Sequence, residues 1–155
     1  MKFSFSRHAN SFKVGVLCVV MFLPVVAYQT NAASNLINPD ELVKLLQSSQ
    51  GEKPLVIQVG FHVLYQQAHI PGSEYIGAAN SEEGLQALRK RMQALPRNKL
   101  IVLYCGCCPW SHCPNIKPAG DALRAMGFNN VKLLYIANNF GADWVDKGYP
   151  TAKGD

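Results

Sequence analysis

The chain has 155 residues, 48% of them hydrophobic, and a formal net charge of +5 at pH 7. This length suits one buried core and is too short for two ordinary domains. Three of the 15 basic residues, Lys2, Arg7 and Lys13, fall at the N-terminus, so residues 34–155 carry 12 basic against 10 acidic side chains. That near balance gives no indication of nucleic-acid binding.

The first 33 residues have the order of a secretory signal peptide. Residues 1–13 are basic without an acid, residues 14–27 are almost wholly apolar, and residues 30–34 are small enough for cleavage. The apolar stretch is shorter than the roughly 20 residues that span a bilayer, so we predict a cleaved signal peptide, with an uncleaved membrane anchor as the alternative. Residues 34–155 then form one exported domain without membrane contact. Its compartment is oxidising, and is the periplasm if the organism is a Gram-negative bacterium.

The remaining residues alternate between helical and strand patterns. Helices are predicted where apolar residues recur every three or four positions behind a capping residue, and strands where short apolar runs occur. The predicted helices begin at Asn38, Phe61, Ser81 and near Pro118, with a last helical turn at 143–147, and the predicted strands are 55–59, 75–76, 99–104 and 131–135. This alternation indicates an α/β fold, an open sheet with helices on both faces. Residues 151–155 are predicted to form a loose tail.

A cysteine cluster follows the most strand-like run. Residues 105–114 read Cys-Gly-Cys-Cys-Pro-Trp-Ser-His-Cys-Pro and contain four of the five cysteines of the chain. No ordinary core needs thiols at that density, so chemistry is expected here. A cysteine at a strand end, shortly before a helix, lies near the positive end of the helix dipole and near loop N–H groups. This position favours a thiolate at Cys105.

Four segments, in the right order, resemble the rhodanese-like domain family. They are the strand 55–59 with residues 65–73, similar to aromatic-x-x-Gly-His-Ile-Pro-Gly-Ala; the strand ending in Tyr104-Cys105; residues 123–131, similar to Leu-x-x-x-Gly-Phe-x-x-Val; and residues 144–150, similar to Trp-x-x-x-Gly-Tyr-Pro. The resemblance implies a mostly parallel central sheet of about five strands, with the catalytic cysteine at a strand's carboxyl end. It also implies a sulfurtransferase that needs no cofactor, in which Cys105 takes up sulfane sulfur as a persulfide and passes it on.

The chain departs from the family pattern in three places. Gln58-Val59-Gly60 stands where members commonly have Asp-Val-Arg, and Asn138-Asn139 stands where a Gly-Gly pair is usual. The loop after Cys105 is longer than the pattern and contains no arginine. A dianion such as thiosulfate needs cationic partners, and the nearest in the sequence is Lys117. The predicted partner is therefore a small sulfur-containing substrate or a thiol acceptor of unspecified identity.

Two alternatives to sulfur transfer rest on the extra thiols Cys107, Cys108 and Cys113, which are candidate redox or resolving residues. A neighbouring thiol that attacks a persulfide on Cys105 would release sulfide and leave a disulfide, which makes a thiol-disulfide redox protein with a redox partner the first alternative. The second is a non-catalytic module that binds a soft metal such as Zn or Cu, or a partner, through thiols and His112. The paired knuckles of ordinary zinc sites are missing, so no resident metal is predicted.

The remaining candidates are structural or support the loop. His69 is predicted to tie its turn to the adjacent strand, and Phe140, Trp144 and Tyr149 to pack in the core or at its rim. Trp110 is predicted to cover the loop. The residues predicted to support the loop are Gly106, Trp110, Ser111, His112 and Lys117.

Overall fold

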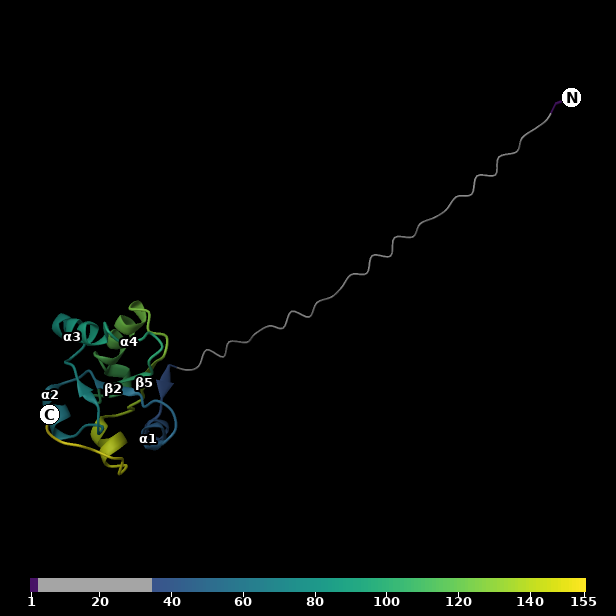
Figure 1. Cartoon of the computed structure of the whole chain (residues 1–155). Helices are drawn as coiled ribbons and strands as arrows, with labels where there is room; N and C mark the ends of the chain where they lie inside the picture. The colour runs from purple at the N-terminus through teal and green to yellow at the C-terminus, as the bar shows by residue number, and fades with distance from the viewer. Residues whose placement is uncertain (3–34) are drawn as a thin grey trace. The chain divides into compact units, whose positions relative to one another are not determined.

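The structure is a computed structural model that describes residues 1–2 and 35–155 (Figure 1). The predicted signal peptide, residues 1–33, lies outside the described residues except for its first two. In the part of the chain that is described, no helix is long and apolar enough to cross a membrane.

Five parallel strands form the central sheet, in the order β1-β5-β4-β2-β3. The strands are β1 (Leu36–Ile37), β2 (Leu55–Gln58), β3 (Glu74–Tyr75), β4 (Ile101–Tyr104) and β5 (Val131–Leu134). β4 lies in the middle, and all of its residues are buried, as expected for a strand covered on both faces. The predicted α/β fold is confirmed, and the sheet is wholly parallel rather than mostly so.

Helices cover both faces of the sheet (Figure 1). They are α1 (Pro39–Gln47), α2 (His62–Gln67), α3 (Glu82–Met92) and α4 (Ile116–Ala125), together with the 3-10 turn η1 (Trp110–His112) and the π-helical turn η2 (Gly141–Val145). α3 and α4 bury Leu88 and Leu123 against one face, whereas α1 and η2 bury Leu42 and Trp144 against the other. The last helical turn is predicted at residues 143–147, whereas η2 begins two residues earlier, at Gly141.

Local capping sets where two of these helices begin. The backbone N–H of Asn38 donates to Glu41 Oε2 at 2.9 Å, and Pro39 occupies the first turn of α1. Ser81 Oγ accepts the backbone N–H of Gly84 at 3.1 Å at the start of α3. These bonds satisfy amide groups that have no partner inside the helix, which explains why the two helices begin where the sequence predicts.

The C-terminal tail is ordered, so the prediction of a loose tail is wrong. Ala152 and His69 exchange two backbone hydrogen bonds of 2.9 Å, and Gly154 N–H donates to the carbonyl of Gln66 at 2.9 Å. Asp155 Oδ1 lies 2.7 Å from His62 Nε2. A short, polar tail is typical of a disordered terminus, which is why the sequence predicts a loose one. Its partners, His62, Gln66 and His69, lie far away in the sequence and come close only in the folded chain.

His69 and the predicted packing aromatics are structural. The buried His69 ring stacks on Tyr65 with 3.9 Å between ring centroids, and its Nδ1 lies 2.9 Å from the Tyr65 carbonyl oxygen. The ring therefore holds the end of α2 rather than an adjacent strand. Trp144 is fully buried and stacks with Phe140 at 5.7 Å, and Tyr149 packs against the same cluster.

Deleting residues 152–155 removes three backbone hydrogen bonds that join the tail to α2 and to His69. We expect the free energy of unfolding, measured by urea denaturation, to fall by about 2–4 kcal/mol at about 1 kcal/mol per bond. Lys153→Ala is the matched control, because it leaves every backbone bond in place. An unchanged stability of the deletion variant would contradict the docked tail.

Candidate active site

Cys105 lies at the carboxyl end of the central strand, where open parallel sheets place their ligands. Gln58 and Tyr104 are register partners, so β2 and β4 end side by side. The buried Gln58 amide joins these ends: its Nε2 donates to the Cys105 carbonyl at 3.3 Å, and its Oε1 accepts the Gly60 N–H at 3.0 Å. Gln58, at the position of the family's usual Asp, thus fixes the backbone beneath the cysteine.

Cys105 is buried, with 5% of the residue exposed, and two groups donate hydrogen bonds to its sulfur. Asn115, the fully buried residue before α4, donates from Nδ2 to Cys105 Sγ at 3.3 Å and accepts the Asn80 N–H on Oδ1 at 2.9 Å. The backbone N–H of Cys107 also donates to Cys105 Sγ. The sequence does not identify Asn115 as a site residue, because nothing local shows that its side chain turns toward the cysteine.

Two glycines leave room around the sulfur. A Cβ on Gly60 would lie 2.9 Å from Cys105 Sγ, closer than real side chains approach. Gly106 has φ 76°, and a Cβ there would lie 2.6 Å from Phe140 Cβ. Gly106 therefore supports the loop as predicted. Gly60, in the place of the family's usual Arg, is a site residue that the sequence did not identify.

A pocket of about 370 Å³ reaches Cys105 from the face of the sheet that carries Tyr104 and Phe140. Its walls are uncharged and include three amide side chains, those of Gln58, Gln67 and Asn139. Because no charged side chain lines this pocket, it offers hydrogen bonds and apolar contact rather than ion pairing to an entering molecule.

The four loop cysteines are free thiols grouped closely together. The Cys105 and Cys107 sulfurs are 3.2 Å apart, and those of Cys107 and Cys108 are 3.1 Å apart. The sulfurs of Cys105, Cys107 and Cys113 all lie within 4.8 Å of one another. Three thiol donors at this spacing suit a thiophilic ion such as Cu(I) or Zn²⁺, so the metal-binding alternative stays a prediction.

The Cys105 and Cys113 sulfurs lie close enough to share a proton, and the hydrogen bonds around Cys113 favour the thiolate there, while the thiolate at Cys105 stays a prediction. The Cys113 sulfur accepts a hydrogen bond from the Cys105 thiol and the backbone N–H groups of Asn115 and Ile116, which lower its pKa to about 5. The pKa of Cys105 is raised because its thiol donates to Cys113 and because it is buried. Burial and the neighbouring Cys107 raise the pKa of Cys108 to about 12. The first amides of α4 thus act on the nearer cysteine.

The other predicted loop residues lie farther out. Trp110 is half-buried, packs against Tyr135 with 5.4 Å between ring centroids, and lines a small cavity with Cys105, Cys108 and Cys113, so it covers the loop. The side chains of Ser111 and His112 are exposed and hydrogen-bond to each other at 2.9 Å. Lys117 forms an ion pair with Asp121 at 2.7 Å on the solvent side of α4. No bond from Lys117 to the cysteines is present among the described residues.

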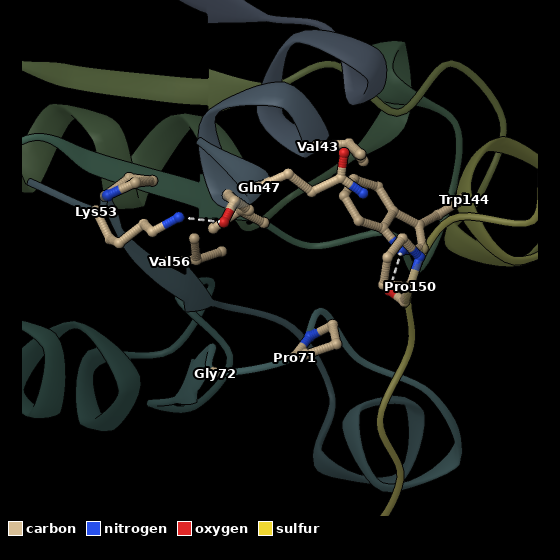
Figure 2. Close-up of a pocket in the computed structure, with 10 residues that line it drawn as sticks. Val43, Gln47, Lys53, Val56, Pro71, Gly72, Trp144 and Pro150 are labelled. Atoms are coloured by element: carbon tan, nitrogen blue, oxygen red, sulfur yellow. Dashed lines mark hydrogen bonds between the residues drawn. The ribbon is translucent and has the colours of Figure 1, made fainter. Parts of the chain in front are cut away.

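A second pocket, of about 390 Å³, lies away from the cysteines, between α1 and the C-terminal segment (Figure 2). Its walls are mainly apolar, with Val43, Pro71 and Trp144 among them. Lys53, its one charged wall residue, donates to backbone carbonyls at the end of α1. The pocket carries no thiol, so the chemistry belongs to the cysteine pocket.

Cys113 is expected to react with iodoacetamide before the other loop cysteines at pH 7. Its rate constant should fall only as the pH drops through about 5, because the thiolate is then protonated. Peptide mass spectrometry after timed alkylation of chelator-treated protein measures each site. The same protein in urea should show the ordinary cysteine inflection near about pH 8.5. If the alkylation rate of Cys113 in the folded protein also changes only near about pH 8.5, the lowered pKa of Cys113 would be contradicted.

Comparison with known proteins agrees with this geometry. No curated protein sequence matches the chain. Among solved structures, the Alr3790 protein from Anabaena sp. superposes with a TM-score of 0.57 and 19% identity, over 76% of this chain and 82% of that one. A structure of EanB carrying a cysteine persulfide, in a tetrahedral intermediate state with ergothioneine, superposes with a TM-score of 0.53 and 24% identity, over 76% of this chain and 28% of that one. At these low identities, the two superpositions show a shared fold.

The family model provides the stronger finding. The model described as rhodanese-like domain matches residues 38–135, which is more than half of the chain and includes the strand that carries Cys105. The five-stranded parallel sheet and the cysteine at the carboxyl end of its central strand agree with that match. The chain belongs to the rhodanese-like domain family.

Proposed function

We propose that this protein is a sulfurtransferase that carries sulfane sulfur as a persulfide on Cys105. The observation that supports this most is the environment of the Cys105 sulfur, which lies at the base of an uncharged pocket and accepts hydrogen bonds from Asn115 Nδ2 and the Cys107 N–H. Fixed donors of this kind stabilise negative charge on Cys105 Sγ, both when it attacks the donor as a thiolate and when it leaves as a thiolate during transfer to an acceptor.

Cys105 and Cys113 form a pair that shares one proton, because their sulfurs lie within 4.8 Å of each other. The reactive form carries that proton on Cys113, and Cys105 attacks the terminal sulfur of the donor as a thiolate. The new bond joins Cys105 Sγ to that sulfur, and the remainder of the donor leaves with the electron pair of the broken S–S bond. The products are an anionic persulfide on Cys105 and a protonated Cys113.

The walls of the pocket favour a donor that presents an uncharged sulfur group to Cys105, such as the neutral S–SH end of glutathione persulfide, whose carboxylates can stay outside the pocket. Lys117 is engaged by Asp121 and 80% exposed, and the pocket has no cationic wall residue. A dianion would lose its hydration without an ion pair in return, which is costly. We therefore propose a low-molecular-weight persulfide or organic polysulfide as the donor class, in preference to thiosulfate.

Export of the domain is part of the proposal. The signal-peptide pattern of residues 1–33 supports secretion, to the periplasm in a Gram-negative bacterium, and an exported thiol enzyme would need a redox partner protein to keep its cysteines reduced. N-terminal sequencing of the protein purified from its native host is expected to find a chain that begins near residue 34. A mature protein that begins at Met1 would contradict cleavage and favour the membrane anchor.

The carrier assignment is tested with a variant that has Ser at positions 107, 108 and 113 and retains Cys105. After incubation with glutathione persulfide and removal of excess reagent, we expect its mass to increase by one sulfur atom, located on the Cys105 peptide and removed by dithiothreitol. Because this variant lacks the Cys113 base, the reaction is run at about pH 9, where more of any thiol is ionised.

The matched control carries Cys105→Ser in addition to the same three changes, and we expect it to gain no sulfur. Thiosulfate is tested in parallel and should load the Cys105-retaining variant more slowly than glutathione persulfide. An adduct that survives Cys105→Ser, or no adduct with either donor, would overturn the proposed function.

A further inference from the structure

Cys113 contacts Cys105 from a different side than the pocket does. The pocket of about 370 Å³ includes Cys105 and Cys107 but not Cys113, and its walls belong to the core face of Tyr104 and Phe140. Cys113 packs with Cys105 and Ile116 against the core beneath α3 and α4, and it shares with Cys105 a second, small cavity that is distinct from the pocket. An incoming donor and Cys113 therefore approach the same sulfur from separate directions.

This arrangement matches the geometry of thiol-disulfide exchange at Cys105. In exchange, the attacking sulfur approaches the central sulfur opposite the leaving sulfur, so the three sulfurs lie close to one line in the transition state, and the disulfide is the product. If the outer sulfur of a Cys105 persulfide extends into the pocket from which it arrived, Cys113 faces the inner sulfur from the other side. The Cys105 and Cys113 sulfurs already lie within 4.8 Å of each other.

Cys113 is better placed for this attack than Cys107 and Cys108, which are closer to Cys105 in the sequence. Cys107 is separated from Cys105 by one residue, Gly106, whose carbonyl accepts the Phe140 N–H at 3.0 Å and whose conformation is held by that contact. A bridge across such a short, fixed segment strains the disulfide dihedral. Cys108 is not within the set of mutually close sulfurs. Seven residues separate Cys105 from Cys113, enough for an unstrained closure.

The structure also supplies donors that stabilise Cys113 as the attacking group. The backbone N–H groups of Asn115 and Ile116, at the start of the ten-residue helix α4, both point at its sulfur. Fixed amides at a helix start favour the anionic form of a thiol during attack. Cys107 lies before η1, and its sulfur is 4.0 Å from Asn115 Nδ2, farther than the 3.3 Å between that nitrogen and Cys105 Sγ.

We propose that Cys113 is a resolving cysteine, which attacks the Cys105 persulfide, releases hydrosulfide and leaves a Cys105–Cys113 disulfide. This inference rests on the proposed function, because it begins from the persulfide. It extends that function from carrying sulfur to reducing sulfane sulfur to sulfide at the expense of two protein thiols.

The step balances in atoms and electrons. The reactants are the anionic persulfide of Cys105 and the thiol of Cys113. The Cys113 sulfur forms a bond with Cys105 Sγ, the bond between Cys105 Sγ and the outer sulfur breaks, and the Cys113 proton leaves with the outer sulfur as hydrosulfide. The outer sulfur gains two electrons, and the two cysteines together lose two. A dithiol reductant then restores the thiols by exchange, so the partner of the second half-reaction is a protein or small molecule with paired thiols.

The test compares wild type, Cys113→Ser, Cys107→Ser and Cys105→Ser, each reduced, treated with chelator and mixed without oxygen with an equimolar amount of glutathione persulfide. Loading of Cys105 releases glutathione rather than hydrosulfide, so hydrosulfide reports the resolving step. We expect stoichiometric hydrosulfide and a Cys105–Cys113 disulfide, identified by peptide mapping, in wild type and in Cys107→Ser. In Cys113→Ser we expect a persistent Cys105 persulfide and hydrosulfide release slower by about ten-fold or more.

Cys105→Ser sets the background from reagent decomposition, and Cys113→Ala guards against a folding defect specific to serine. Hydrosulfide release by Cys113→Ser and Cys113→Ala at the wild-type rate would overturn the resolving role, as would a disulfide mapped to Cys105 and Cys107. A persulfide that persists on Cys105 in wild type would overturn it while leaving the proposed function intact. No sulfur on Cys105 in any variant would overturn the proposed function itself.

Discussion

The buried amide of Asn115 connects the parts of the chain that surround the nucleophile. Its oxygen accepts the Asn80 N–H at 2.9 Å, and its nitrogen donates to Cys105 Sγ at 3.3 Å. A buried polar group left without a partner costs about 1–3 kcal/mol, so the fold keeps both contacts together. The end of β4, the turn before α3 and the start of α4 are thereby held in one arrangement, and Cys113 takes its position from the same helix start.

Hydrogen bonds, rather than cationic side chains, control charge in this site. The α4 amides reach Cys113, the Asn115 amide reaches Cys105, and Lys117 is occupied by Asp121 at the surface. In a buried environment such bonds act more strongly than they would in water. A proton shared between two cysteines can therefore switch which sulfur is nucleophilic, without any charged residue in the pocket.

The departures from the family pattern form a consistent set. At the positions where an acid and an arginine are usual, this chain has Gln58, which joins two strand ends, and Gly60, which leaves space beside the sulfur. A side chain at Gly60 would meet Cys105 Sγ at 2.9 Å. The site thus has an amide and bare backbone at these two positions, and its longer loop places extra thiols beside Cys105.

The sequence by itself determined the alternation of strands and helices, the helix starts at Asn38 and Ser81, and the position of Cys105 at a strand end, because these depend on periodicity and capping within a few residues. Only the tertiary structure decided that the two-residue strand β1 joins the sheet, that the tail docks on α2, and that the Asn115 amide at the start of α4 reaches Cys105. Each of these depends on groups far apart in sequence or on the direction of a helix end, and local pattern carries no information about such contacts.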